Sequence, residues 1–207
     1  MKKNLLFIAI ILVTLASCVK DRTAPAVGPV VTPTGDTLMY YWNFNNADST
    51  IHTPDFSKTG ANAYFSYVAA YIDYTSGSSI NLIGPIADTG SCLRLRNPSQ
   101  SLTFHMPTTG YDSLVMSMAV EASSSGASID DVYYTVDGTN YINTGLATPA
   151  YNVTTSFTQV TIDFSSIPAT GNNPNFAVKL VPANNSAGTA TSGNDRFDNV
   201  TLSGVKQ

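Results

Sequence analysis

Short runs in which apolar and polar residues alternate recur along most of this chain, each bounded by residues typical of turns. A period of two places successive side chains on opposite faces of an extended strand, so each run predicts a strand with one buried face. The run 157–164, for example, places Val160, Ile162 and Phe164 on one face. Because no stretch of the sequence shows a convincing helical period, the pattern predicts an all-β fold.

The runs predict roughly nine or ten strands, with the long aromatic run at 63–74 forming one or two of them. The expected strands fall at 38–44, 63–74, 91–96, 101–106, 113–120, 131–136, 141–142, 157–164, 175–181 and 196–202. Asn97-Pro98 reads as a turn, and Asp137–Asn140 contains the Asp-Gly pair typical of a hairpin. The chain from Leu38 onward therefore predicts a single antiparallel β-sandwich of two sheets.

The first residues have the layout of a secretion signal. Lys2 and Lys3 precede the apolar run Leu5–Ala16, which is shorter than the roughly 20 residues that a membrane-spanning helix needs. The following residues, Leu15–Cys18, resemble the lipobox of bacterial lipoproteins. That resemblance implies cleavage before Cys18 and acyl chains on its thiol, which hold a protein at a membrane. The alternative is an ordinary signal peptide in which Cys18 has no special role.

A second segment separates this signal from the predicted sandwich. Val19–Thr37 contains three prolines and two glycines and has no helical period, so it predicts an extended tether. The expected organisation is a lipoprotein signal peptide at 1–17, the lipidated cysteine and tether at 18–37, and the β-sandwich domain at 38–207. An Asp directly after the lipidated cysteine would resemble an inner-membrane retention signal, and Val19 stands there instead. The sequence therefore favours anchoring in the cell envelope at the outer membrane.

The charge and the cysteines exclude several classes of protein. Ten Lys and Arg face fourteen Asp and Glu, and removal of the first seventeen residues leaves 8 − 14 = −6. Such a chain is no electrostatic nucleic-acid binder, which would need a basic patch. Two cysteines exclude a disulfide scaffold and a Cys-based zinc cage. Cys92 is expected to be a small buried side chain, although Arg94 and Arg96 share its strand parity and leave a reactive thiol open.

Three short motifs carry a resemblance to a family. Tyr41–Asn45, Tyr134–Tyr141 and Arg196–Gly204 together resemble the jelly-roll domains of secreted and surface proteins of the Bacteroidetes, which are similar in layout to concanavalin-like and MAM-like sandwiches. The resemblance covers about 38–204. It implies a non-catalytic module for carbohydrate binding, adhesion or surface display, and it does not choose among these.

The same resemblance implies a structural calcium ion between the first and last strands. Asp198 would be one ligand, with Asn45 or Asp48 and nearby carbonyls supplying the others, because calcium prefers hard oxygen ligands. The alternative is that Asp198 caps a turn or accepts hydrogen bonds from the backbone across the sandwich. No other cofactor is expected.

The residues needed for catalysis are sparse. Glu121 is the only Glu and is expected to end a strand in solvent, while neighbours such as Asp130 and Asp131 point to opposite faces of a strand. His52 and His105 lie far apart in the sequence, and His105 shares parity with Thr103 on a sheet surface. The chain is therefore expected not to be an enzyme. The alternative is a jelly-roll glycan hydrolase or lyase in which His52 or His105 meets an Asp or a Tyr.

The aromatic residues divide into core and surface candidates. Tyr40, Trp42 and Phe44 share one strand face and are expected in the core, since three large rings are seldom left in water. Tyr133 and Tyr134 point to opposite faces, so one of them is expected to be exposed. The best candidates for a ligand face, in a register that the pattern does not fix, are Tyr64, Tyr67, Tyr71 and Tyr74.

The sequence thus favours a lipid-anchored envelope protein whose sandwich binds glycans or another surface molecule. Two alternatives stay open, namely the jelly-roll hydrolase or lyase and a structural or adhesive envelope component with a protein partner. The ligand-binding residues themselves are not assigned by the sequence.

Overall fold

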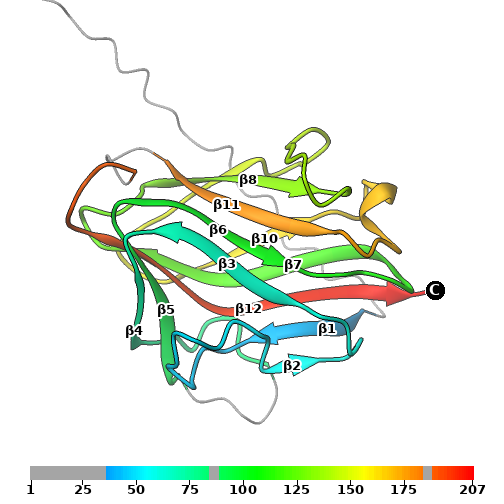
Figure 1. Ribbon diagram of the computed structural model, residues 1–207, viewed down its shortest axis with the longest axis horizontal. Helices are drawn as coiled ribbons and strands as arrows, with labels where there is room; N and C mark the ends of the chain where they lie inside the picture. The colour runs from blue at the N-terminus through cyan, green and yellow to red at the C-terminus, as the bar shows by residue number, and fades with distance from the viewer. Residues whose placement is uncertain (1–35, 84–88, 184–187) are drawn as a thin grey trace, which may run out of the picture.

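The computed structural model describes residues 36–83, 89–183 and 188–207, and these form two antiparallel β-sheets packed as two layers (Figure 1). One sheet contains β10 (Thr158–Asp163), β7 (Tyr111–Ala122), β12 (Asn194–Lys206), β1 (Thr37–Trp42) and β2 (Phe56–Ser57). In the same sheet, β5 (Ser91–Arg96) pairs with β12, and β4 (Ile72–Ser76) pairs with β5. The second sheet contains, in spatial order, β3 (Tyr64–Ala69), β6 (Ser99–His105), β11 (Ala177–Ala183), β8 (Ile129–Thr135) and β9 (Ala150–Asn152). The predicted two-sheet antiparallel sandwich is therefore confirmed.

The long strand β12 organises the larger sheet. Its first residues, Asn194–Phe197, pair with β5, whereas its later residues, from Val200 to Gly204, pair with β1, and β7 runs along its other side. The closing motif predicted from the sequence thus joins the first strand of the domain to its middle strands. The only helical element within the described ranges is a short 3-10 turn, Pro168–Thr170.

The core lies between the sheets. Tyr40, Trp42 and Phe44 are all buried there, as their shared parity predicts. The Trp42 ring meets the Phe104 ring of the opposite sheet edge-on, with centroids 5.2 Å apart. Burial of rings this large supplies much of the hydrophobic free energy that holds the two sheets together.

Some elements differ from the sequence pattern. The pattern does not predict the short strands β2 and β9, since two or three residues carry no visible period. The expected strand at 141–142 forms only an isolated bridge between Tyr134 and Ile142, because the chain from Asp137 onward folds into a loop over the sheet. The predicted run 63–74 divides into β3 and β4, as one of its two interpretations had it.

The predicted signal peptide, the lipidated Cys18 and the tether as far as residue 35 lie outside the described residues. Within the part of the chain that the structure describes, no helix is long and apolar enough to cross a membrane.

Candidate functional site

The outer face of the five-stranded sheet carries a group of rings, of which Tyr64 is exposed and His105, Tyr133 and Tyr141 are half-buried. Register pairs Tyr64 of β3 with His105 of β6, which in turn pairs with Ala177 of β11. The next outward row places Lys179 of β11 opposite Tyr133 of β8. Because these residues share parity, their side chains leave the same face of the sheet.

The first part of this face is a stacked pair of rings. The Tyr64 and His105 rings lie nearly parallel, with an interplanar angle of 14° and centroids 4.2 Å apart. The Ser66 hydroxyl lies 3.1 Å from His105 Nε2. Burial lowers the pKa of His105, which favours the neutral imidazole at pH 7. The pair is therefore an uncharged stack in which each ring covers one face of the other, and the parity that placed His105 on a sheet surface is confirmed.

The second part of the face is a lysine between two tyrosines. Lys179 Nζ lies 4.0 Å from the centroid of the Tyr141 ring and 5.9 Å from that of Tyr133. At these distances an ammonium is attracted to the negative face of an aromatic ring. We call the set Tyr64, His105, Tyr133, Tyr141 and Lys179 the aromatic platform.

A rigid loop holds Tyr141 over the sheet. Asp137 Oδ1 accepts hydrogen bonds from the backbone N–H groups of Thr139 at 2.8 Å and of Asn140 at 2.7 Å, and Thr135 Oγ1 donates to the same oxygen. These bonds, led by those from Asn140, hold the pKa of Asp137 well below its usual range. The loop is thus organised by its own carboxylate, so Tyr141 is already in place when a ligand arrives.

A hollow of about 190 Å³ opens between this loop and the stacked pair. Its lining residues are Asn62, Tyr64, His105, Pro107, Gly138, Pro174, Asn175 and Phe176. The hollow adjoins the flat rings, so a chain of several sugar units could lie along the platform and place one unit in it.

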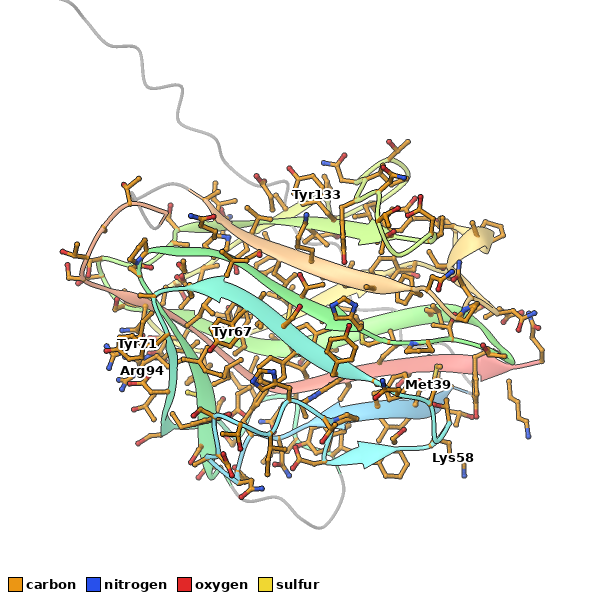
Figure 2. The ribbon with its side chains drawn as sticks, in the orientation of Figure 1. Met39, Lys58, Tyr67, Tyr71, Arg94 and Tyr133 are labelled. Carbon is orange, nitrogen blue, oxygen red and sulfur yellow. The ribbon has the colours of Figure 1, made fainter. Side chains whose placement is uncertain are left out.

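The four tyrosines proposed as ligand-face candidates separate in the structure. Tyr64 belongs to the aromatic platform, whereas Tyr67 and Tyr74 pack against the core. Tyr71 is 53% exposed but stacks over Arg96 at the β4–β5 end of the larger sheet, and Figure 2 shows it beside Arg94 and well away from Tyr133. One of the four is therefore at the site.

The sequence alone does not reveal two members of the platform. Lys179 follows the alternation of its strand and looks there like any solvent-facing lysine, while the pattern predicts a hairpin strand at Tyr141. Tyr133 was found in part, since parity predicted that either it or Tyr134 is exposed, and Tyr134 is buried. The cross-strand register, which the sequence does not supply, is the signal that joins these residues.

The catalytic candidates come together only in part, since His105 stacks on the Tyr64 ring and His52 meets the Tyr67 ring edge-on. Glu121 is largely shielded from solvent and forms an ion pair with Arg196, so the expectation of an exposed strand end is wrong. The cause is that β7 continues to Ala122 beside β12. His52 stacks on Phe65 and lies 3.1 Å from the Ser49 carbonyl, and in the described part of the chain neither histidine is hydrogen-bonded to an Asp or Glu.

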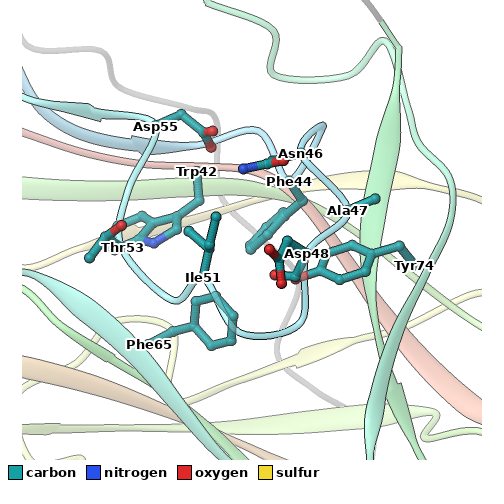
Figure 3. A pocket seen from close by; sticks show the side chains of 10 residues that line it. All are labelled: Trp42, Phe44, Asn46, Ala47, Asp48, Ile51, Thr53, Asp55, Phe65 and Tyr74. Atoms are coloured by element: carbon teal, nitrogen blue, oxygen red, sulfur yellow. The ribbon is translucent and has the colours of Figure 1, made fainter.

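A second hollow beneath the loop after β1 is too small for a sugar. It holds about 20 Å³, which is room for about one water molecule. Figure 3 shows Trp42, Phe44 and Phe65 turned toward it, with Asp48 and Asp55 at its edge. Its rings are nearly inaccessible, so this hollow belongs to the core rather than to a binding site.

Asp198 is a buried carboxylate whose hydrogen bonds come from backbone N–H groups. Its Oδ2 accepts the Ser78 N–H at 2.6 Å and its Oδ1 accepts the Asn199 N–H at 2.8 Å, so it hydrogen-bonds the backbone as the alternative interpretation predicted. Burial raises the pKa of Asp198 to about 7. No Lys, Arg or His of the described residues forms an ion pair with it. A cation near this carboxylate would therefore lower the cost of its charge.

The other two proposed calcium ligands differ in how well they fit. Asn45 Oδ1 accepts the Ser91 N–H at 2.8 Å, and Gly90, the neighbour of Ser91, accepts the N–H of Gly77 beside Asp198. Asn45 and Asp198 therefore lie in the same region of the structure. Asp48 is exposed, and its Oδ1 is engaged by Thr50. Among the residues that the structure describes, no three His, Cys, Asp or Glu side chains converge as a metal site.

Cys92 is fully buried, as expected for a small strand residue. Burial raises the pKa of its thiol to about 12, and its Sγ donates to the Ser76 carbonyl. Arg94 and Arg96 are engaged by Asp73 instead, with Arg94 making a bidentate pair at 2.7 Å. This setting favours the inert thiol over the reactive thiolate.

Comparison with known proteins places the fold alone. No family model matches the chain, and no curated protein does. Among solved structures, the N-terminal CBM22-1–CBM22-2 tandem domain of Xyn10C from Paenibacillus barcinonensis aligns with a TM-score of 0.52 and 11% identity, over 86% of this chain and 48% of that one. This chain therefore spans about half of the tandem structure, and the likeness confirms a jelly-roll β-sandwich.

Two further structures come from Clostridium thermocellum. A family 11 carbohydrate-binding module in complex with a β-1,3-1,4-mixed-linked tetrasaccharide aligns with a TM-score of 0.43 and 12% identity, over 85% of this chain and 99% of that one. The CBM22-1 and GH10 modules of xylanase 10B, complexed with xylohexaose, also align with a TM-score of 0.43 and 12% identity, over 81% of this chain and 28% of that one.

Proposed function

We propose that this chain is a lipid-anchored cell-envelope protein whose jelly-roll domain binds glycans, without turning them over, on the aromatic platform. The observation that carries the proposal is the stacked Tyr64–His105 pair, which lies beside the hollow on the outer face of the five-stranded sheet. The lipobox-like residues before Cys18 and the proline-containing segment after it support the anchor and its place at the outer membrane.

The chemistry of a sugar ring suits this surface. Each ring has an apolar face of C–H groups and a rim of hydroxyls, so its face can cover an exposed aromatic ring while its rim reaches polar groups. Covering the apolar area of such rings is favourable by about 25 cal/mol per Å². The Ser66 hydroxyl lies on the same outward row as Lys179 and could meet the rim.

Replacing either of two rings of the platform should weaken glycan binding. Tyr64→Ala and Tyr141→Ala each remove one stacking surface, so we expect at least about a tenfold loss of affinity, equal to about 1.4 kcal/mol, for any glycan that the protein binds on an array. Tyr71→Ala removes a more exposed ring at the other sheet and should bind as the parent does. Equal losses in all three variants would exclude the platform as the binding surface.

The same experiment separates the alternatives. Analysis of bound glycans for new reducing ends should show no cleavage, and cleavage that is lost in His105→Ala would favour the hydrolase or lyase instead. If no glycan binds and a protein is recovered from envelope extracts, the structural or adhesive component with a protein partner replaces the glycan-binding module.

Calcium remains part of the proposal through Asp198 and Asn45. When bound, the ion would supply positive charge to a carboxylate that burial otherwise holds near neutrality. Millimolar calcium should raise the melting temperature by about 5 °C over a chelator, the effect expected when the ion exceeds its dissociation constant about 100-fold. Asp198→Asn should abolish this rise, whereas Asp48→Asn should retain it. If calcium leaves the melting temperature of the parent protein unchanged, a structural calcium ion at this site is excluded.

A further inference from the structure

Lys179 is the one cation on the outer face of the five-stranded sheet in the described part of the chain. It stands on β11, the middle strand, with Tyr133 and Tyr141 beside its ammonium. Within the described residues no ion pair joins it to a carboxylate, and none of its three N–H groups donates a hydrogen bond. The ammonium is therefore available to a ligand.

The other described cations are occupied or distant. Arg94 and Arg96 share Asp73, and Arg196 pairs with Glu121, all on the larger sheet. The remaining two, Lys58 and Lys206, are exposed and lie after β2 and at the end of β12. Figure 2 shows Lys58 far from Tyr133. A chain with a net charge of −4 thus keeps, among its described residues, a lysine without an ion pair in the middle of its aromatic platform.

The nearest acid on that face forms no ion pair with this lysine. Asp131 lies on β8 two residues before Tyr133, opposite Val181, and its side chain is only 8% exposed. The aromatic rings meanwhile hold the ammonium at a fixed place, so a ligand that meets it loses little additional side-chain freedom.

We propose that the platform selects glycans whose sugar rings carry carboxylates, with the carboxylate of one uronic acid accepting a hydrogen bond from Lys179 Nζ. The neighbouring sugar rings lie on Tyr141 and on the Tyr64–His105 pair. This inference rests on the glycan-binding function proposed above and names the class of glycan. A charge-assisted hydrogen bond is about twice as strong as a neutral one, so the carboxylate supplies the discrimination.

The test compares polymers that differ in charge alone. Polygalacturonate, alginate and glucuronoxylan are each presented to the purified protein beside their carboxyl-reduced forms, which keep the backbone and lose the charge. We expect binding to at least one acidic polymer and about 10- to 100-fold weaker binding to its reduced form. Lys179→Met should abolish that preference, Lys179→Arg should keep most of it, and Lys58→Met should leave it unchanged.

The outcomes separate this inference from the function on which it rests. Equal binding to acidic and reduced polymers, or binding to neutral glycans alone, overturns the selectivity for carboxylates and leaves glycan binding intact. Absence of binding to every glycan overturns both. A preference for acidic polymers that survives in Lys179→Met also overturns the role of this lysine, provided that its melting temperature matches that of the parent.

Discussion

In the presence of a chelator, the free energy of unfolding should fall by at least about 3 kcal/mol as the pH rises from about 5 to about 8. The cause is Asp130, which is fully buried and whose Oδ2 accepts the Tyr151 hydroxyl at 2.8 Å. Burial first, and then the neighbouring carboxyl of Asp195, raise the pKa of Asp130 to about 8. Its other oxygen, Oδ1, has no hydrogen-bond partner among the described residues.

The sign follows from comparing the two states. In the unfolded chain the carboxyl of Asp130 ionises near the ordinary aspartate pKa of 3.8, whereas in the folded domain it keeps its proton until about pH 8. Between these values the native state binds the extra proton, so stability is greatest at the acidic end and is lost as the pH rises. One proton corresponds to about 1.4 kcal/mol per pH unit. Asp195 and Asp198 act in the same direction, because burial also raises the pKa of each of these carboxyls.

Urea denaturation at a series of pH values measures this slope. Asp130→Asn should flatten it by about one proton, because the amide keeps the shape and an acceptor for Tyr151 but cannot ionise. Tyr151→Phe should lower stability at every pH and keep the slope, since it removes the hydrogen bond that favours the ionised form and leaves the carboxyl buried. A parent protein whose stability rises between pH 5 and 8 would contradict the assignment.

The fold could be predicted from the sequence because its signals are local. Alternation identified the strand faces, and the parity of Tyr40, Trp42 and Phe44 placed those rings correctly in the core. The hairpin at Asp137–Asn140 shows where local signals end. Its Asp-Gly pair does mark a turn, but the hydrogen bonds of Asp137 build a wider loop, and only a bridge at Ile142 returns to the sheet.

The candidate site could be predicted only in part because it depends on long-range register. Parity located His105 and one of Tyr133 and Tyr134 on the surface, yet nothing local indicates that β3 and β8 belong to the same sheet as β11. Three of the four candidate tyrosines lie elsewhere for specific reasons. Tyr67 has the opposite parity to Tyr64 on β3, while the register shift after Val68 and the turn into β4 carry Tyr71 and Tyr74 toward the larger sheet.

The buried acids illustrate the same limit. Parity correctly separated Asp130 from Asp131, and Asp130 does point between the sheets. Its partner Tyr151 lies on β9, a strand of three residues that the sequence does not reveal. A carboxyl on an inward strand face contradicts the alternation of apolar and polar residues. It is explained only once the buried hydroxyl that donates a hydrogen bond to it is known.

Asn199→Ala should destabilise the domain by about 4 kcal/mol. Asn199 is buried and stands at φ +49°, where β12 shifts its register against β7 between Asp198 and Thr201. Its Oδ1 accepts the Tyr41 hydroxyl at 2.6 Å, and its Nδ2 donates to the carbonyls of Ser78 and Ile80 at 2.9 Å. Each buried group left without a partner costs about 1–3 kcal/mol, and a left-handed alanine adds about 1 kcal/mol.

Urea denaturation of two further variants separates the contributions to this loss of stability. Asn199→Gly loses the same hydrogen bonds and tolerates the positive φ, so it should be about 1 kcal/mol more stable than Asn199→Ala. Tyr41→Phe removes the hydroxyl that Asn199→Ala would leave buried and unpaired. The double variant Tyr41→Phe/Asn199→Ala should therefore cost less than the sum of the two single variants, by about 1–2 kcal/mol.

Strict additivity in that double variant would mean that the Tyr41 hydroxyl finds another partner once Asn199 is gone. The network would then be a consequence of the β12 register shift rather than a cause of it. Coupling of the expected size would instead identify Asn199 as the residue that ties the segment at Ser78–Ile80 to the closing strand. Because the Ser78 N–H also holds Asp198 Oδ2, loss of Asn199 should then weaken any calcium-dependent rise in melting temperature as well.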